Sequence, residues 1–210
     1  MKEIYLVRHG ESEGNAGTHY QNENTQLTEL GREQAAFVAE RATKLNVDTI
    51  LASAMVRAQQ TAGIISERIG ISLESSDLFV ERRRPSEQID QPKDDPKVQE
   101  AEEAIMQSSS ASGIRYSDEE NFDDLNARSK AALSFLEQHP SDKILVVTHG
   151  VFLRNIVAQV IFGDALTGRD CGEVLSTFIA NNTGITVLQF DPDNRRPWRL
   201  LTWNDHAHLG

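Results

Sequence analysis

Residues 8–12, Arg-His-Gly-Glu-Ser, bring a cation, an imidazole and a glycine together within one short segment. A neutral imidazole is a good nucleophile near neutral pH because its ordinary pKa is about 6.5. The planar guanidinium of Arg8 can hold two phosphate oxygens at once. Gly10 allows a tight turn whose backbone N–H groups could face an anion. The segment therefore indicates a phosphate site that includes Arg8 and His9.

Two later segments carry similar residue types. Residues 53–62 read Ser-Ala-Met-Val-Arg-Ala-Gln-Gln-Thr-Ala, and residues 148–150 read Thr-His-Gly. Each of these segments follows a short apolar run typical of a strand, as residues 8–12 do. Open α/β sheets bind ligands beyond the carboxyl ends of their strands. We therefore expect Arg57 and His149 to join His9 at one edge of a sheet.

The composition is that of an ordinary globular protein, with 39% hydrophobic and 25% charged residues among 210. One domain over residues 1–210 is favoured over two small ones. The net charge of −11 makes nucleic acid an unfavourable partner. Arginines stand out against this acidity and suggest a local anion site, although a single arginine more often covers a solvated helix face. They are Arg8, Arg57, Arg82, Arg83, Arg84 and Arg154.

The chain lacks the patterns of a membrane or secreted protein. No apolar run approaches the roughly 18 residues that cross a bilayer. Met1 leads directly into residues 4–7 without the features of a signal peptide. Cys171 is the one cysteine, which rules out an intrachain disulfide. We expect a cytoplasmic protein with no membrane partner.

Short apolar runs alternate with longer segments of helical periodicity, the pattern of a layered α/β fold. We expect strands at residues 4–7, 48–52, 72–75, 144–147, 184–190 and 199–203. Residues 144–147 should be central because they are apolar on both faces. We expect helices at about 29–45, 54–69 and 123–138 and another after Gly150, with Thr28 and Ser53 as N-caps and Gly70 as a stop signal.

Residues 82–120 differ from the rest and are interpreted as an insertion. Three prolines interrupt the first part, and residues 108–113 have the composition of a loop. A short acidic helix is expected between Pro96 and Gln107, with Val98, Ala101, Ile105 and Met106 spaced to dock on the rest of the protein. A mobile lid and a surface excursion both remain open for this segment.

Taken together, the motifs resemble those of the histidine phosphatase superfamily, also called the phosphoglycerate-mutase-like family. Residues 8–12 match its signature, and the resemblance covers nearly the whole chain apart from residues 82–120 and the C-terminal tail. It implies a three-layer sandwich with a mostly parallel central sheet between helices. The further matching residues are Asn15, Leu27, Thr28, Gly31, Gln34, Ala35, Ser53, Arg57, Ala58, Gln60, Thr61, Ala62, Glu81, Thr148, His149, Gly150, Arg154, Asn182 and Thr183.

The resemblance also implies roles for the site residues. His9 is the nucleophile that carries the phosphate, and Arg8, Arg57 and His149 hold the phosphoryl oxygens. Further substrate contacts are expected from Asn15, Gln21 and Gly150, although the loop at 16–26 aligns less well with the family pattern. Charge stabilisation is the main help that a protein gives to phosphoryl transfer. No metal or other cofactor is therefore expected.

Glu81 matches the family's general acid, which protonates the departing oxygen and then activates water. Asp77 and Glu87 are the alternatives, because a glutamate near an apolar run is more often a surface residue. Arg82, with Arg83 and Arg84, is expected to meet the remainder of an anionic substrate, while one or two of the three lie on the surface. The other histidines, His19, His139, His206 and His208, are expected to be structural or exposed.

The leading interpretation is a histidine-phosphatase-type enzyme, a phosphoric monoester hydrolase. The mutase branch of the family carries a Tyr-Gly-Gly-type sequence soon after the acid, which residues 82–87 here lack. A cofactor-dependent phosphoglycerate mutase is the second hypothesis. The phosphatase branch often has a second glycine after His-Gly, and Val151 stands at that position here. A phospholigand-binding regulatory protein with little turnover is the third. Small phosphorylated metabolites and phosphoproteins both remain possible substrates, and the oligomeric state is open.

Overall fold

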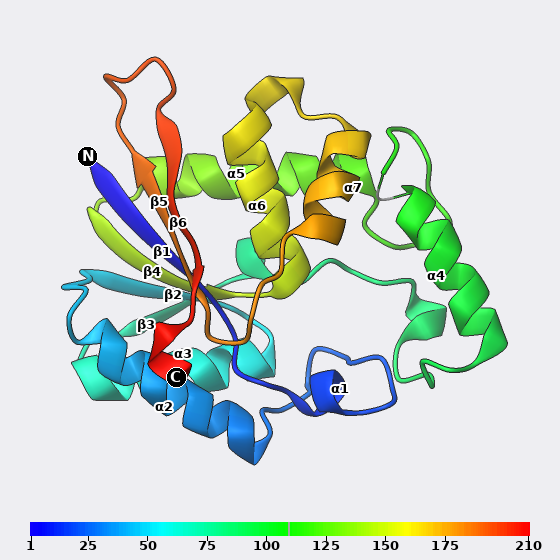
Figure 1. Ribbon diagram of the computed structural model, residues 1–210, viewed down its shortest axis with the longest axis horizontal. Coiled ribbons are helices and arrows are strands. Elements are labelled where there is room, and N and C mark those ends of the chain that lie inside the picture. Colours follow the sequence, from blue (N-terminus) through cyan, green and yellow to red (C-terminus); the bar gives the residue numbers. More distant parts are fainter. Residues whose placement is uncertain (109) are drawn as a thin grey trace.

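The computed structural model describes residues 1–108 and 110–210 and contains a six-stranded sheet in the order β3-β2-β4-β1-β5-β6 (Figure 1). β1, β2, β3 and β4 are parallel, whereas β5 and β6 are antiparallel to their neighbours. The expected mostly parallel sheet, with residues 144–147 in its interior, is confirmed. The strands are β1 (Lys2–Arg8), β2 (Thr49–Ser53), β3 (Leu73–Ser76), β4 (Lys143–Thr148), β5 (Ile185–Phe190) and β6 (Trp198–Asp205).

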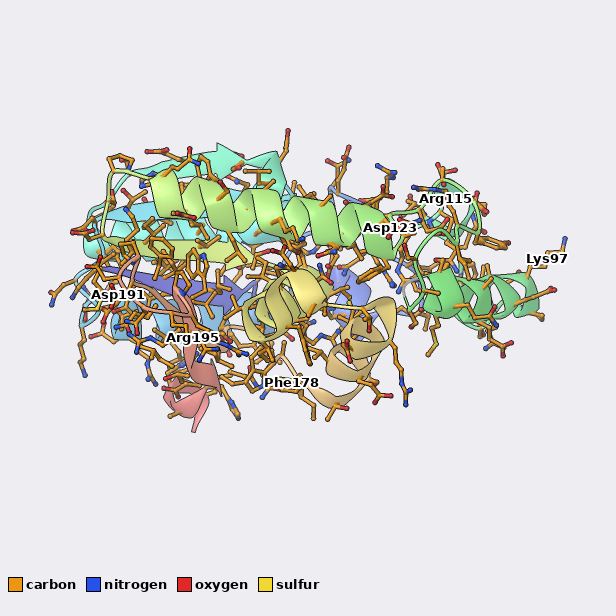
Figure 2. All side chains as sticks on the ribbon, turned by 90° about the horizontal axis from the view of Figure 1, so that it is seen from above. Lys97, Arg115, Asp123, Phe178, Asp191 and Arg195 are labelled. Carbon is orange, nitrogen blue, oxygen red and sulfur yellow. The ribbon has the colours of Figure 1, made fainter. Side chains whose placement is uncertain are left out.

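Helices cover both faces of the sheet. Successive side chains of a strand point to opposite faces, so Ile4 and Leu6 pack with α5 and α6, while Tyr5 and Val7 pack with α2 and α3. The three layers predicted from the sequence are therefore present, and Figure 2 shows α5, in light green, running along the sheet. The helices are α1 (Glu13–Ala16), α2 (Glu29–Ala42), α3 (Val56–Ile69), α4 (Pro96–Ser108), α5 (Phe122–Gln138), α6 (Gly150–Phe162) and α7 (Gly168–Thr177).

The predicted signals at Thr28 and Gly70 are confirmed, whereas the cap at Ser53 is wrong and α2 ends at Ala42, before the predicted end at about residue 45. The Thr28 side chain accepts a hydrogen bond from the backbone N–H of Gly31, and Gly70 ends α3 in the left-handed conformation at φ 74°. Ser53 does not cap α3, because it is the last residue of β2 and the N-cap position is Met55. The Ser53 hydroxyl instead contacts the site described below.

The insertion contains the expected acidic helix, α4, which lies at the side of the molecule (Figure 1). Val98, Ala101 and Ile105 are buried, as predicted from their spacing. Met106 is 61% exposed, so its predicted docking is wrong. It follows Ile105 by one residue, which turns it about 100° away from the buried face. The predicted loop at 108–113 includes residue 109, which lies outside the described residues.

The sequence interpretation missed two helices. α1 has only one turn, too short for a periodic pattern. α7 begins with a capping box in which Thr167 and Asp170 bond each other's backbone N–H groups. Within the described part of the chain, no helix combines the length and the apolar character needed to span a membrane.

Candidate active site

His9 follows β1 directly and is only 1% exposed. Its Nδ1 lies 2.6 Å from the carbonyl oxygen of Gly10. Because a carbonyl can only accept, Nδ1 must carry the proton and Nε2 must carry the lone pair. Burial lowers the pKa of His9 well below its ordinary value, and the nearby His149, Arg57 and Arg8 lower it further. The imidazole is therefore neutral, with Nε2 available as a nucleophile.

The turn that carries His9 is held by α2 and α3. A Cβ atom on Gly10 would lie 2.3 Å from the carbonyl oxygen of Gly31, and one on Gly31 would lie 1.9 Å from that of Glu11. The N–H of Gly10 donates to Thr61 Oγ1 at 3.1 Å, and the N–H of Glu11 donates to Gln34 Oε1 at 2.8 Å. These motif residues therefore fix the position of the turn, and only glycine fits at the two backbone crossings.

Arg57 and Arg8 approach His9 from two strand ends. Arg57 is 1% exposed, and its Nε donates to His9 Nε2 at 3.3 Å. Burial is the main cause that lowers the pKa of Arg57 to about 10; the charge of Glu81 opposes the shift and that of Arg8 adds to it, and the guanidinium stays charged at neutral pH. Arg8 Nη1 donates to the carbonyl oxygen of Ala180 at 2.6 Å, while its Nε is buried without a hydrogen-bond partner.

His149 stands between β4 and α6, with its ring centroid 5.0 Å from that of His9. Its Nε2 is hydrogen-bonded to Ser53 Oγ at 2.7 Å, and its Nδ1 is buried without a partner. Ser53 Oγ also accepts from the N–H of Met55 at 3.2 Å, which holds the hydroxyl in place beside the ring. Unpartnered buried polar atoms are rare, and two of them beside His9 suit an anion-binding site.

Glu81 lies against the N-terminus of α6. Its Oε1 accepts from the backbone N–H groups of Arg82 at 2.9 Å and Phe152 at 3.0 Å, and its Oε2 accepts from that of Val151 at 3.1 Å. Loss of water by itself raises the pKa of Glu81. These backbone hydrogen bonds and the charge of Arg57 outweigh that effect and bring the pKa below its ordinary value. Glu81 is therefore a carboxylate at neutral pH.

The two alternative acids, Glu87 and Asp77, differ in their surroundings. Glu87 is exposed, and its carboxylate accepts from the hydroxyl of Ser117. Asp77 contributes to the wall of a larger cavity of about 830 Å³, which Glu81 also lines. Of these two residues, Asp77 is the stronger alternative, because it lines a cavity together with Glu81.

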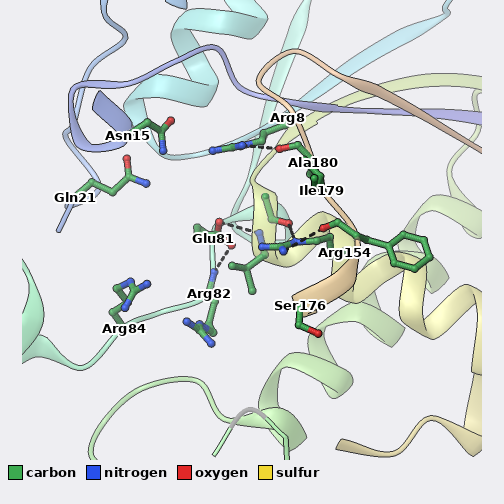
Figure 3. A pocket seen from close by; sticks show the side chains of 13 residues that line it. Arg8, Asn15, Gln21, Glu81, Arg82, Arg84, Arg154, Ser176, Ile179 and Ala180 are labelled. Atoms are coloured by element: carbon green, nitrogen blue, oxygen red, sulfur yellow. Dashed lines mark hydrogen bonds between the residues drawn. The ribbon is translucent and has the colours of Figure 1, made fainter. Parts of the chain in front are cut away.

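A cavity of about 380 Å³ opens beside Glu81 (Figure 3). It and the larger cavity share Gln21, Glu81, Arg82 and Arg84, and Arg57 lines the larger one. Arg83 is exposed, as expected for one of the three consecutive arginines. The structure thus brings all the predicted residues together: His9 and His149 are buried beside Arg57, and the others line the smaller cavity. Those others are Arg8, Asn15, Gln21, Glu81, Arg82 and Gly150.

The family model of the histidine phosphatase superfamily, branch 1, matches residues 4–206. The chain belongs to this superfamily. Among curated proteins, it is 33% identical to the "Probable phosphoglycerate mutase GpmB" of Enterobacter sp. (strain 638) over 169 residues, which are 77% of this chain and 75% of the relative. The corresponding protein of Yersinia pestis (strain Pestoides F) is 31% identical over the same shares.

Two solved structures have the same fold. Bacillus stearothermophilus YhfR superposes with a TM-score of 0.84 at 23% identity, with all of each chain covered. A mycobacterial glucosyl-3-phosphoglycerate phosphatase superposes with a TM-score of 0.78 at 23% identity, covering 98% of this chain and 100% of the other. The similarity confirms the phosphoglycerate-mutase-like architecture of this superfamily member.

Sequence reasoning gave no site role to the segment after α7, although it contributes to the smaller cavity. Phe178, Ile179 and Ala180 line it, and Arg154 holds this segment by donating from Nη1 to the carbonyls of Leu175 and Phe178. Arg154 Nε also donates to Gly150 O at 2.9 Å. The available signal was the Thr167 capping box followed by apolar residues at helical spacing.

Asn182 is another residue whose site contact the sequence did not specify. Its Nδ2 donates to the backbone carbonyl of His9 at 2.9 Å. The next residue, Thr183, has φ 57°, a strained conformation for a β-branched side chain, and its N–H donates to Arg8 O at 2.9 Å. In this superfamily member, the residues just before β5 therefore support the His9 turn.

Among the described residues, no group of three or more His, Cys, Asp and Glu side chains is arranged to hold a metal ion. The positive charge near His9 comes instead from Arg8 and Arg57.

Proposed function

We propose that this chain is a phosphomonoester hydrolase that works through a covalent phosphohistidine at Nε2 of His9. The observation that carries the proposal is the hydrogen bond from His9 Nδ1 to Gly10 O, which fixes the tautomer and leaves the lone pair on Nε2. The low pKa of His9 keeps that lone pair unprotonated at neutral pH.

The phosphoryl oxygens would be held by Arg8, Arg57 and His149. Arg8 Nε and His149 Nδ1 are the two buried polar atoms that have no protein partner at the site. In the free site Arg57 Nε donates a hydrogen bond to the nucleophilic nitrogen. When a phosphoryl group is bound, the same N–H can donate to one of its oxygens instead. Negative charge spreads over these oxygens in the transition state, so fixed positive groups accelerate the step.

Glu81 would act as both acid and base. It is ionised in the free site, but a bound phosphate brings negative charge that raises its pKa and favours uptake of a proton. The Nε2–P bond forms while the ester P–O bond breaks, and Glu81 gives its proton to the departing oxygen. Water then attacks phosphorus, Glu81 takes a proton from that water, and the N–P bond breaks to release inorganic phosphate.

A phosphoglycerate mutase is the second candidate, and the 31–33% identity to proteins named as probable phosphoglycerate mutases favours it. Such an enzyme would return the phosphoryl group to a second hydroxyl instead of to water. We favour hydrolysis because residues 82–87 lack the Tyr-Gly-Gly-type sequence of the mutase branch.

The substrate proposed for this site is a small alkyl phosphate with a further anionic group. Arg82 and Arg84 line both cavities beside Glu81. Burial and the charge of Arg84 lower the pKa of Arg82, although the charges of Glu81 and Glu102 raise it. An anion on the leaving group would relieve the repulsion between Arg82 and Arg84.

The test compares release of inorganic phosphate with interconversion of 2- and 3-phosphoglycerate. A hydrolase should release phosphate from nitrophenyl phosphate and from a panel of phosphorylated metabolites without any bisphosphorylated primer. Interconversion that depends on the primer, with little phosphate released, would establish a mutase instead. Binding of inorganic phosphate without turnover would refute both and indicate a phospholigand-binding protein.

A further inference from the structure

The insertion pairs directly with the loop that carries Gln21. The N–H of Tyr20 donates to Gln91 O at 2.9 Å, and the N–H of Asp90 donates to Tyr20 O at 3.1 Å. The N–H of Lys93 donates to Thr18 O at 2.7 Å. Residues 18–20 and 90–93 thus run side by side in an antiparallel ladder. The loop from the N-terminal third of the chain and the insertion share one set of backbone hydrogen bonds.

Lys93 extends this contact to α1. Its Nζ donates to the carbonyl oxygens of Gly14 and Gly17, each at 2.8 Å. These carbonyls belong to the end of the short helix, where backbone oxygens lack partners and a cation is favourable. Gly14 in turn leaves room for Gln21, because a Cβ on Gly14 would lie 2.3 Å from Cβ of Gln21. Lys93 therefore fixes the surface against which Gln21 packs.

A second contact joins the loop to α4. The Arg84 guanidinium lies 4.1 Å from the centroid of the Tyr20 ring, a cation–π distance. The Tyr20 hydroxyl donates to Glu102 Oε2 at 3.1 Å, and Arg84 pairs with the same carboxylate. Figure 3 shows Gln21 and Arg84 on the same side of the pocket. The insertion thus holds the loop before Gln21 at two places, through Lys93 near Gly17 and through Arg84 and Glu102 at Tyr20.

This loop also reaches the nucleophile. The carbonyl oxygen of Asn22 accepts from Arg57 Nη1 at 3.0 Å, and Arg57 Nε bonds His9 Nε2. A displacement of residues 18–22 would therefore remove a partner of Arg57 as well as move Gln21. The contacts connect Lys93, in the insertion, with two groups beside the phosphoryl site.

We propose that Lys93 and the Tyr20–Arg84–Glu102 cluster are positioning residues, which hold the loop so that Gln21 and Arg57 meet the phosphoryl group. The insertion is then a fixed part of the active site. This proposal rests on the proposed function only in naming a phosphoryl group as the bound species. Its test therefore uses inorganic phosphate as a probe, which requires no turnover.

The first experiment replaces Lys93 with methionine, which keeps most of the length of the side chain and removes its charge. The dissociation constant for inorganic phosphate, measured by calorimetry, should rise about tenfold, and kcat/KM for nitrophenyl phosphate should fall to a similar degree. Lys93→Arg can still donate to two carbonyls and should restore most of the phosphate affinity and most of kcat/KM. Lys97→Met is the matched control, because Lys97 is exposed at the outer end of α4 (Figure 2) and should change neither quantity.

A double-mutant cycle tests whether Lys93 acts through the loop. Gln21→Ala should weaken phosphate binding, and adding Lys93→Met to it should cost much less than Lys93→Met costs alone. In the second cluster, Glu102→Gln should weaken phosphate binding several-fold, whereas Glu103→Gln, at an exposed neighbouring position, should not.

Wild-type phosphate affinity in Lys93→Met, or full additivity with Gln21→Ala, would overturn the proposal. A uniform loss of folding, seen as a lowered melting temperature that Lys93→Arg does not restore, would also contradict a positioning role. If the wild-type protein binds phosphate but hydrolyses no phosphomonoester, the proposed function fails while the phosphate-binding results still decide the role of Lys93.

Discussion

Ser53 Oγ and His149 Nε2 lie 2.7 Å apart, across the carboxyl ends of the neighbouring strands β2 and β4. The hydrogen bond fixes the orientation of the His149 ring, and the N–H of Met55 holds the serine hydroxyl through the same oxygen. A serine to which the sequence assigned no site role therefore orients the histidine that lies beside His9.

Ser53→Ala should lower kcat/KM for nitrophenyl phosphate about tenfold or more, because His149 loses the partner that sets its orientation. The fold should persist, since alanine fits the space of the buried serine. Steady-state kinetics with a thermal melt would measure both. Unchanged kcat/KM in a folded variant would show that His149 does not need Ser53.

His9→Ala should abolish turnover while preserving the fold, because the covalent route requires Nε2. Rapid quench of the wild type with a radiolabelled phosphate donor should give a protein label that is labile in acid and stable in base. His9→Ala should give no label. Label that persists in this variant would place the nucleophile elsewhere.

Glu81→Gln should separate the two roles of the acid. Glutamine cannot deliver a proton, so phosphoenzyme formation should slow steeply for alkyl phosphates and only slightly for nitrophenyl phosphate, whose leaving group is already stable as an anion. Breakdown of the intermediate needs an activated water and should slow in both cases. The expected signal is a burst of nitrophenol followed by a slow steady state.

The control for this experiment is Glu87→Gln, since Glu87 is exposed and bonded to Ser117. It should behave like wild type with both kinds of substrate. If Glu81→Gln also behaves like wild type, Asp77, which lines the larger cavity, becomes the next acid to test.

Stability should fall as the pH is lowered below about 6.5. Burial lowers the pKa values of His9 and His149 in the folded protein, so the unfolded chain binds more protons than the folded chain once the pH drops below the ordinary histidine pKa. Each histidine can remove about 1.4 kcal/mol per pH unit in that range. The lowered pKa of Glu81 acts in the same direction at still lower pH.

The measurement is the melting temperature from pH 7 to pH 5, for the wild type and for His149→Gln. The variant has one fewer histidine that must stay neutral when folded, so its melting temperature should depend less steeply on pH. Parallel curves for the two proteins would mean that His149 does not oppose protonation in the folded state.

Activity should survive exhaustive dialysis against a chelator. Arg8 and Arg57 supply the positive charge at the proposed site, and transfer through His9 and Glu81 needs no Lewis acid. Phosphate release before and after treatment is the measurement. Loss of activity that one added divalent ion restores would require a different mechanism.

The sequence by itself determined most of the sheet and the chemistry of the site. Apolar runs such as residues 144–147 can only be satisfied inside a layered sheet, and the parallel strands bring the residues that follow them to one edge. The sequence therefore predicts that Arg8, His9, Arg57 and His149 lie together. This prediction depends only on the position of each residue just after a short apolar run, which can be read from the sequence.

Only the tertiary structure decided how these residues are held. The Asn22 carbonyl on Arg57, the Lys93 ammonium on Gly14 and the Ser53 hydroxyl on His149 join positions far apart in the chain. Such hydrogen bonds do not recur at a fixed spacing along the chain. Because every residue has a backbone carbonyl, no pattern of residue types predicts which carbonyl will accept. The insertion shows the difference most clearly. Its composition predicted a helix between prolines, but its pairing with the Gln21 loop depends on backbone groups that meet only after the chain has folded.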